Sequence, residues 1–145
     1  MTARAFVDSN ILLYAVSGDP ADVAKKQTAL ALLKRGDLGL STQVLSEFYV
    51  VSTGAKLPSP LSHDEAEAFI NIWKRFAIQA VTVEVFERAL AIRKDLPISF
   101  WDALILAAAV QLGCHTLYSE DFNHGQQFGD LKALNPFRVG TSLSV

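Results

Sequence analysis

The chain has 145 residues, of which half are apolar and 19% are charged, so we expect a folded domain and exclude a disordered or low-complexity protein. Its one cysteine, Cys114, excludes a disulfide-stapled scaffold and is typical of a reducing compartment. The net charge of −2 neither supports nor excludes a nucleic-acid partner, although phosphate binders are usually basic.

The N-terminus and the apolar runs predict a protein that is neither exported nor embedded in a membrane. Residues 1–8 read Met-Thr-Ala-Arg-Ala-Phe-Val-Asp and lack the long apolar core of a signal peptide. The longest strongly apolar run, residues 103–110, is far shorter than the roughly 20 residues that span a bilayer. We therefore expect a single domain over residues 1–145, a cytoplasmic location and no membrane partner.

The first half of the chain alternates short apolar runs with longer helical patterns. We expect strands at residues 3–7 and 38–41, and helices at residues 11–16, 21–34 and 42–53. Gly18-Asp19-Pro20 is typical of a turn, and Gly36 of a helix end. Pro58 and Pro60 then break the chain.

The second half repeats the alternation. Ser62 and Glu65 form a capping-box pattern for a helix that runs to residue 76. We expect helices at residues 84–94 and 99–112, strands at 80–83, 115–118 and 131–134, and a polar loop over 119–129. Strands that alternate with helices predict an α/β fold with a mostly parallel sheet.

Two acids follow expected strands. Asp8 comes directly after residues 3–7, and Asp121 comes shortly after residues 115–118. Ligands bind at the carboxyl ends of strands in open parallel sheets. Taken alone, however, Asp8 is better explained as a helix N-cap and Asp121 as an ordinary polar loop residue.

Two further acids lie on apolar helix faces. Glu47 shares its face with Val44 and Phe48, and Asp102 shares its face with Ile105 and Leu106. A buried carboxylate is costly unless it is paired, protonated or bound to metal. Alternatively, Glu47 reaches outward from the edge of its apolar stripe, and Asp102 completes a capping box with Ser99.

The four acids carry more weight together than singly. In a parallel sheet they can converge on one edge, where carboxylates would repel one another unless a cation were present. Oxygen ligands of this kind suit Mg²⁺ or Mn²⁺, and such sites hydrolyse phosphodiesters by in-line displacement. Without these four carboxylates, the 13 basic and 15 acidic residues leave a net charge of +2, which is compatible with an RNA substrate.

The same segments resemble the motifs of the PIN-domain family. Residues 6–14 (FVDSNILLY), 45–48 (LSEF), 99–105 (SFWDALI) and 117–122 (LYSEDF) resemble its four acidic motifs in order, and residues 135–137 (NPF) resemble the close of VapC-like members. The resemblance spans nearly the whole chain. Each motif is short and weakly specific by itself, and their specificity comes from the combination.

The resemblance implies a three-layer α/β/α fold and a Mg²⁺- or Mn²⁺-dependent ribonuclease that cleaves single-stranded RNA. It implies that Asp8, Glu47, Asp102 and Asp121 are catalytic and bind the metal, with Asp8 and Asp102 as the central ligands. For VapC-type toxins it also implies a homodimer that a cognate antitoxin neutralises. Glu120, adjacent to Asp121, competes for the fourth position.

Two other functions compete with this one. A receiver-like signalling domain needs a phosphate-accepting aspartate after the third strand and a lysine after a late one, where this chain has Val83-Glu84 and Ser119. A non-catalytic PIN-like binding module keeps the fold but has no need of four acids. Metal binding separates this module from the ribonuclease.

Overall fold

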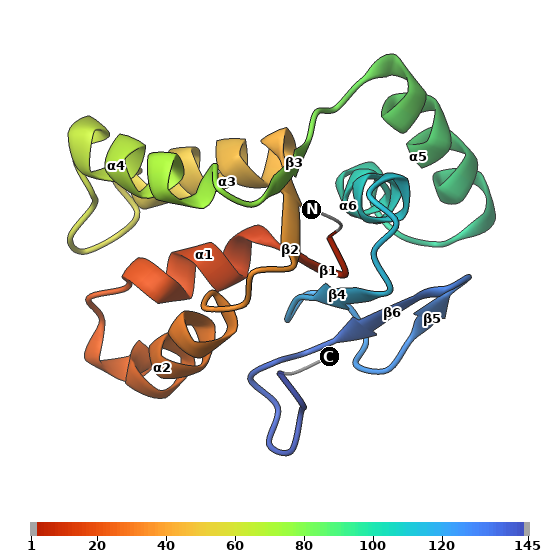
Figure 1. Cartoon of the computed structure of the whole chain (residues 1–145). Helices are drawn as coiled ribbons and strands as arrows, with labels where there is room; N and C mark the ends of the chain where they lie inside the picture. The colour runs from red at the N-terminus through yellow and green to blue at the C-terminus, as the bar shows by residue number, and fades with distance from the viewer. Residues whose placement is uncertain (1–2, 144–145) are drawn as a thin grey trace.

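A six-stranded sheet forms the middle layer of the protein, seen here as a computed structural model (Figure 1). The structure describes residues 3–143, so residues 1–2 and 144–145 of the expected domain lie outside it. The strands are β1 (Ala5–Val7), β2 (Leu38–Ser41), β3 (Ala77–Gln79), β4 (Thr116–Tyr118), β5 (Gln127–Phe128) and β6 (Leu131–Leu134). Their order is β3-β2-β1-β4-β6-β5, with β5 antiparallel to β6 and every other described pair parallel.

Strand β1 lies at the centre of this sheet. It pairs with β2 on one side and β4 on the other, and all three of its residues are fully buried. A strand that is covered on both faces reads as a continuous apolar run, which is why Ala5-Phe6-Val7 has no polar alternation. The carboxyl end of this rigid strand leads directly to Asp8.

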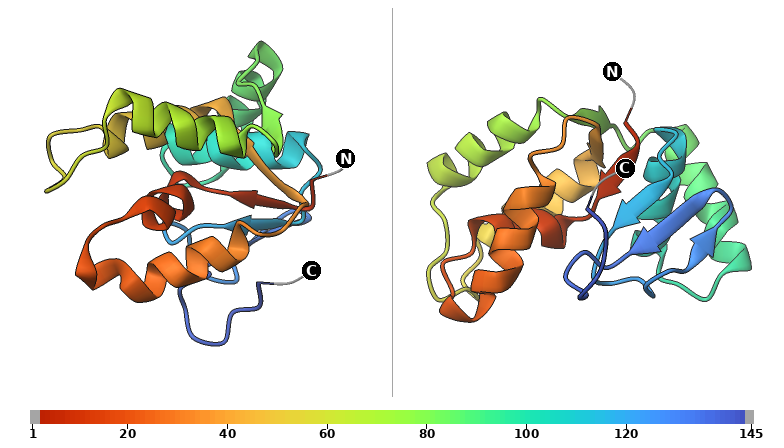
Figure 2. Two further views of the ribbon diagram at one scale, coloured as in Figure 1. Left: turned by 60° about the vertical axis from the view of Figure 1, so that its left-hand side comes forward. Right: turned by 60° about the horizontal axis from the view of Figure 1, so that its bottom comes forward.

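Helices cover both faces of the sheet. They are α1 (Ser9–Val16), α2 (Val23–Leu32), α3 (Thr42–Ser52), α4 (His63–Trp73), α5 (Val83–Asp95) and α6 (Phe100–Gln111), with a short 3-10 helix, η1 (Pro20–Asp22), before α2. In Figure 2, α2 and α6 lie on opposite sides of β1 and β4, which gives the expected three-layer α/β/α fold.

Helix α6 is buried along most of its length. Residues 103–109 are all buried, because one side of α6 packs against the sheet and α5 covers its other side. A helix that is apolar all round is expected in such a position. This packing fixes the first turn of α6, which carries Asp102.

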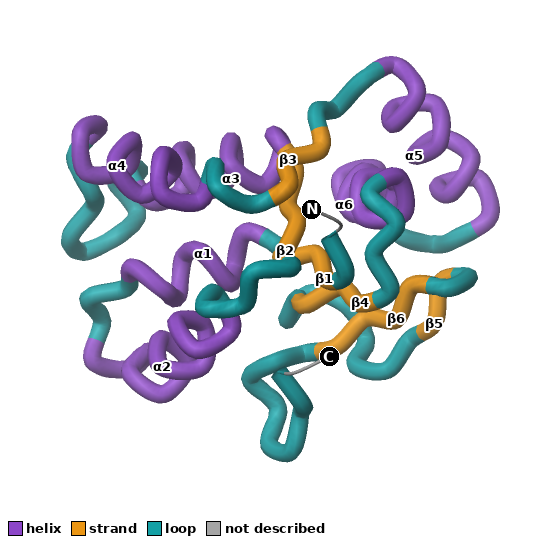
Figure 3. Tube along the Cα trace, viewed as in Figure 1, coloured by secondary structure: helices purple, strands orange, loops and turns teal. Residues whose placement is uncertain are grey.

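Most expected elements are present, but one strand was predicted in the wrong place and one was missed (Figure 3). The expected strand at residues 80–83 is wrong: β3 ends at Gln79, and the Thr82 hydroxyl accepts a hydrogen bond from Val85 N and caps α5. The loop predicted at residues 119–129 contains the two-residue strand β5. The capping box of Ser62 and Glu65 is confirmed.

The helices of residues 3–143 include none with the length and apolar character that crossing a membrane requires.

Candidate active site at the carboxyl edge of the sheet

The four acids come from four segments that meet beyond the carboxyl ends of the central strands. Asp8 follows β1, Glu47 lies on α3 directly after β2, Asp102 lies in the first turn of α6, and Asp121 follows β4. The pKa of Asp8 is raised in part by the charges of Glu47 and Asp121, and so is that of Asp102. Glu47 and Asp121 therefore lie close enough to both Asp8 and Asp102 to repel their charged forms. We refer to these four carboxylates as the acidic site.

Asp8 is the most buried of the four, with 4% of its surface exposed. Its Oδ1 accepts a hydrogen bond from Ser9 N at 2.7 Å, and its Oδ2 accepts one from the Ser119 hydroxyl at 2.7 Å. Burial raises the pKa of Asp8 from its usual 3.8 to about 6, against the opposing effect of these two hydrogen bonds. Asp8 is therefore the N-cap of α1, and its charged form is destabilised by burial.

Ser9 and Asn10 connect Asp8 to two of the other acids. The Ser9 hydroxyl donates to Glu47 Oε2 at 3.0 Å. The Asn10 amide donates to Asp121 Oδ2 and to the Ser119 hydroxyl, both at 3.2 Å. The first turn of α1 thus holds carboxylates from α3 and from the loop after β4 beside Asp8.

Asp102 is half-buried at the start of α6. Its backbone N–H donates to the Ser99 hydroxyl at 3.1 Å, so Ser99 caps the helix as expected. Burial, followed by the charge of Asp121, raises the pKa of Asp102. The cap and the place in the acidic site are compatible, because the cap uses the backbone N–H of Asp102, and the hydrogen bond between Ser99 and the Asp102 side chain only partly opposes the rise in pKa.

Glu120 and Asp121 have different partners, although they are adjacent. Glu120 accepts from the Tyr14 hydroxyl at 2.7 Å and pairs with Lys25 at 3.0 Å. Asp121 is exposed and contacts Asn10 instead. The charge of Glu120 is therefore balanced inside the chain, and the geometry favours Asp121 as the fourth acid.

The four carboxylates of the acidic site have no cationic partner of this kind among the described residues. Within residues 3–143 the ion pairs are Lys25–Glu120, Arg35–Asp37 and His63–Glu67, and none of them includes any of the four acids. In the same range, no group of three or more His, Cys, Asp or Glu side chains is arranged so that it could hold a metal ion.

The donor chemistry of the acidic site nevertheless fits a hydrated divalent cation. Mg²⁺ usually keeps several waters and takes only one or two protein carboxylates, so it does not need three converging side chains. Two amide oxygens, Asn10 Oδ1 and Gln43 Oε1, are also buried there with no hydrogen-bond partner in the described residues. Such acceptors can receive hydrogen bonds from the waters of a cation.

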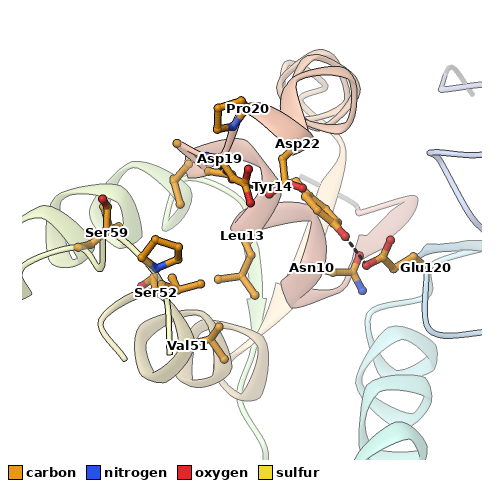
Figure 4. Close-up of a pocket in the computed structure, with 16 residues that line it drawn as sticks. Asn10, Leu13, Tyr14, Asp19, Pro20, Asp22, Val51, Ser52, Ser59 and Glu120 are labelled. Carbon is orange, nitrogen blue, oxygen red and sulfur yellow. Dashed lines mark hydrogen bonds between the residues drawn. The ribbon is translucent and has the colours of Figure 1, made fainter. Parts of the chain in front are cut away.

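A cavity of about 590 Å³ adjoins the acidic site through Asn10 and Glu120 (Figure 4). It lies between the end of α1 with the turn that follows it, and the end of α3 with the loop that leads to α4. Its wall is largely apolar, formed by Leu13, Val16, Val51, Leu57, Pro58 and Leu61, and Asp19 and Asp22 add acidic groups.

Four polar residues that hold the acids in place, Ser9, Asn10, Ser119 and Gln43, were not predicted from the sequence. Ser9 and Asn10 suit a helix cap as well as Asp8 does, and the i, i+4 spacing of Gln43 and Glu47 was the available signal for Gln43. His124, which lies in the loop after β4, accepts a hydrogen bond from Asn135 N at 2.9 Å and so helps to fix that loop.

Comparison with known families gives one match, to the PIN domain, over residues 5–126. This range contains all four acids. None of the curated proteins matches the sequence significantly.

Solved structures with the same fold include toxin proteins. A toxin–antitoxin complex from Klebsiella pneumoniae has 21% identity and a TM-score of 0.67, and the match covers 93% of this chain and 99% of that one. Mycobacterium tuberculosis VapC20, described as a Sarcin-Ricin loop cleaving toxin, has 23% identity, a TM-score of 0.61, and coverage of 82% and 89%. VapBC2 from Rickettsia felis, bound to a promoter DNA fragment, has 19% identity, a TM-score of 0.60, and coverage of 90% and 98%. At these identities the likeness establishes the fold.

Proposed function

Because this chain belongs to the PIN-domain family, we propose that it acts as one domain, as a divalent-metal-dependent endoribonuclease and the toxin of a type II toxin–antitoxin pair. The observation that carries the proposal is the acidic site. Four carboxylates gather at the carboxyl edge of a parallel sheet, and none of them has a cationic partner within the described residues. The charges of Glu47 and Asp121 help to raise the pKa values of Asp8 and Asp102, and carboxylates that repel one another in this way favour a bound cation.

In this proposal Asp8 and Asp102 hold Mg²⁺ or Mn²⁺, and Glu47 and Asp121 complete its surroundings and orient the attacking water. Asp8 suits this role because β1 and the Ser9 and Ser119 hydrogen bonds fix its carboxylate. When bound, the cation would polarise the phosphodiester and favour deprotonation of water at neutral pH. The expected products carry a 5′-phosphate and a 3′-hydroxyl.

The partners follow from the family and from the neighbours. Single-stranded RNA is the proposed substrate, in keeping with the RNA-cleaving description of VapC20. A cognate antitoxin is the proposed inhibitor, because two of the neighbours named above are toxin–antitoxin assemblies. We also propose a homodimer, as the family resemblance implies, and the cytoplasmic location that the sequence predicts.

The proposal is tested by cleavage of a fluorescent single-stranded RNA with Mg²⁺, Mn²⁺ or EDTA. We expect cleavage that needs the cation and that falls more than about 100-fold in Asp8→Asn, since even the outer partners of metal ligands cost about 10- to 100-fold. Asp95→Asn, an exposed aspartate at the end of α5, is the matched control and should cleave normally.

One observation favours the non-catalytic binding module: the carboxylates are not arranged as a ready-made metal site in residues 3–143. Calorimetry with MnCl₂ separates the two functions. Undetectable heat of Mn²⁺ binding in a wild-type chain that does not cleave RNA would reject the nuclease and leave the module. Cleavage that is undiminished in Asp8→Asn would reject the acidic site as the catalytic centre.

A further inference from the structure

Gln43 is a buried amide in the first turn of α3, with 9% of its surface exposed. Polar side chains are rarely buried unless their hydrogen bonds are satisfied. Neighbouring Thr42 and Ser46 on the same helix are exposed, so the inward direction of Gln43 is specific to this residue. The contacts of its amide group explain that direction.

The amide nitrogen of Gln43 makes two hydrogen bonds. Nε2 donates to Glu47 Oε1 at 2.8 Å, one turn further along α3, and to the carbonyl oxygen of Trp101 at 3.1 Å. The opposite orientation of the amide would place its oxygen against a carboxylate and a carbonyl, so the hydrogen-bond network fixes the assignment.

These bonds connect the two helices that carry the second and third acids. Trp101 directly precedes Asp102 on α6, whereas Glu47 lies on α3. Glu47 Oε2 is held by the Ser9 hydroxyl, so both oxygens of this carboxylate accept from neutral donors. Neutral donors orient a carboxylate and leave its charge available.

The second polar atom of the amide, Oε1, is buried and has no partner among the described residues. A free acceptor beside a carboxylate can accept a hydrogen bond from a cation's water. The Nε2 of Gln43 thus orients Glu47, and its Oε1 is placed to accept a hydrogen bond from a water of a hydrated ion.

We propose that Gln43 is a positioning residue of the acidic site: it holds the Glu47 carboxylate at a fixed place relative to the first turn of α6, and so to Asp102. This inference rests on the proposed metal-dependent function. It goes beyond the four acids, because it assigns the relative placement of two of them to a neutral amide that bridges α3 and α6.

The test measures Mn²⁺ binding by calorimetry in the full chain, free of any partner. Gln43→Met keeps the length and burial of the side chain but removes both hydrogen bonds. We expect the dissociation constant for Mn²⁺ to rise about tenfold, the usual cost of losing an outer partner of a metal ligand.

Gln111→Met is the matched control. Gln111 also has a buried Oε1 without a partner in the described residues, but it lies at the far end of α6 and its Nε2 contacts Glu84 at 3.4 Å. Gln111→Met should bind Mn²⁺ like the wild type. Its melting temperature should change by about as much as that of Gln43→Met. Gln43→Leu repeats the measurement if Gln43→Met does not fold.

A double-mutant cycle separates positioning from general support of the fold. In a Glu47→Ala background, most of the effect of Gln43→Met on the Mn²⁺ affinity should disappear, because the carboxylate that Gln43 orients is gone, and any remainder measures the contact of Gln43 Oε1 with a cation's water. The inference is overturned if Gln43→Met binds Mn²⁺ within twofold of wild type, or if its effect persists undiminished in Glu47→Ala. A wild-type chain that binds no Mn²⁺ would instead overturn the proposed function, and this inference with it.

Discussion

Glu120 and Asp121 are consecutive acids in one loop, yet they lie in opposite electrostatic surroundings. Glu120 faces Lys25 and the Tyr14 hydroxyl, and Lys25 also lies 4.7 Å from the centre of the Tyr14 ring. Asp121 faces Asn10 and raises the pKa values of Asp8 and Asp102. The difference teaches that the position of the counter-charge, rather than the presence of a carboxylate, distinguishes a supporting acid from a candidate ligand.

The largest effect should separate these two neighbours directly. We expect Asp121→Asn to lower Mg²⁺-dependent RNA cleavage by about three orders of magnitude, the upper range for the loss of one group that acts on the transition state. Glu120→Gln should cleave within about threefold of wild type. Initial rates at saturating Mg²⁺ measure both. Equal losses in the two variants would show that the distinction drawn between them is wrong.

The second prediction concerns the unbalanced charge of Asp8. A pKa of about 6 in the folded chain, against 3.8 when the chain is unfolded, corresponds to about 3 kcal/mol. The folded chain holds this proton more tightly, so Asp8 should lower the free energy of unfolding as pH rises from about 4 to about 6. Above about pH 6 the full decrease of about 3 kcal/mol in the free energy of unfolding should be present.

Urea unfolding in EDTA, from pH 4 to 7.5, measures this effect as the difference between wild type and Asp8→Asn. Other groups titrate in both chains and cancel in the comparison. Added Mg²⁺ should restore wild-type stability at pH 7 and leave Asp8→Asn unchanged. A difference that is constant with pH would contradict the raised pKa of Asp8.

The smallest effect should come from removing the ion pair of Glu120 with Lys25. Lys25→Met removes the partner of Glu120, but 42% of the Lys25 side chain is exposed, so the free energy of unfolding should fall by less than about 1 kcal/mol. RNA cleavage should change by less than about threefold. Lys26→Met, on the same helix, is the control, and a tenfold loss of cleavage in Lys25→Met alone would assign Lys25 to the substrate.

Strands of the central sheet could be predicted from the sequence where a short apolar run is bounded by turn residues, because such a run is typical of a buried strand. Residues 38–41 and 131–134 were located without error. The strand expected at residues 80–83 failed because Val81 and Val83 suit a strand, while Thr82 suits a helix cap, and the tertiary fold uses the cap. Local propensity could not decide between them.

The acids were predicted from their positions after strands and on apolar helix faces, and the structure brings all four together. Their order at the edge depends on β1 lying between β2 and β4, which no local pattern encodes. The choice between Glu120 and Asp121 needed the position of Lys25, which is 95 residues away from Glu120. The bridge made by Gln43 needed the Trp101 carbonyl, a backbone group that carries no sequence signal.

The central place of β1 has a consequence for synthesis of the chain. β1 is made well before one of its two neighbours, β4, which spans residues 116–118, and Asp121 comes later still. A growing chain on the ribosome therefore carries Asp8 through the synthesis of 111 further residues before the Ser119 hydroxyl that fixes its carboxylate is made. Completion of the site thus depends, by topology alone, on a segment that is translated long after Asp8.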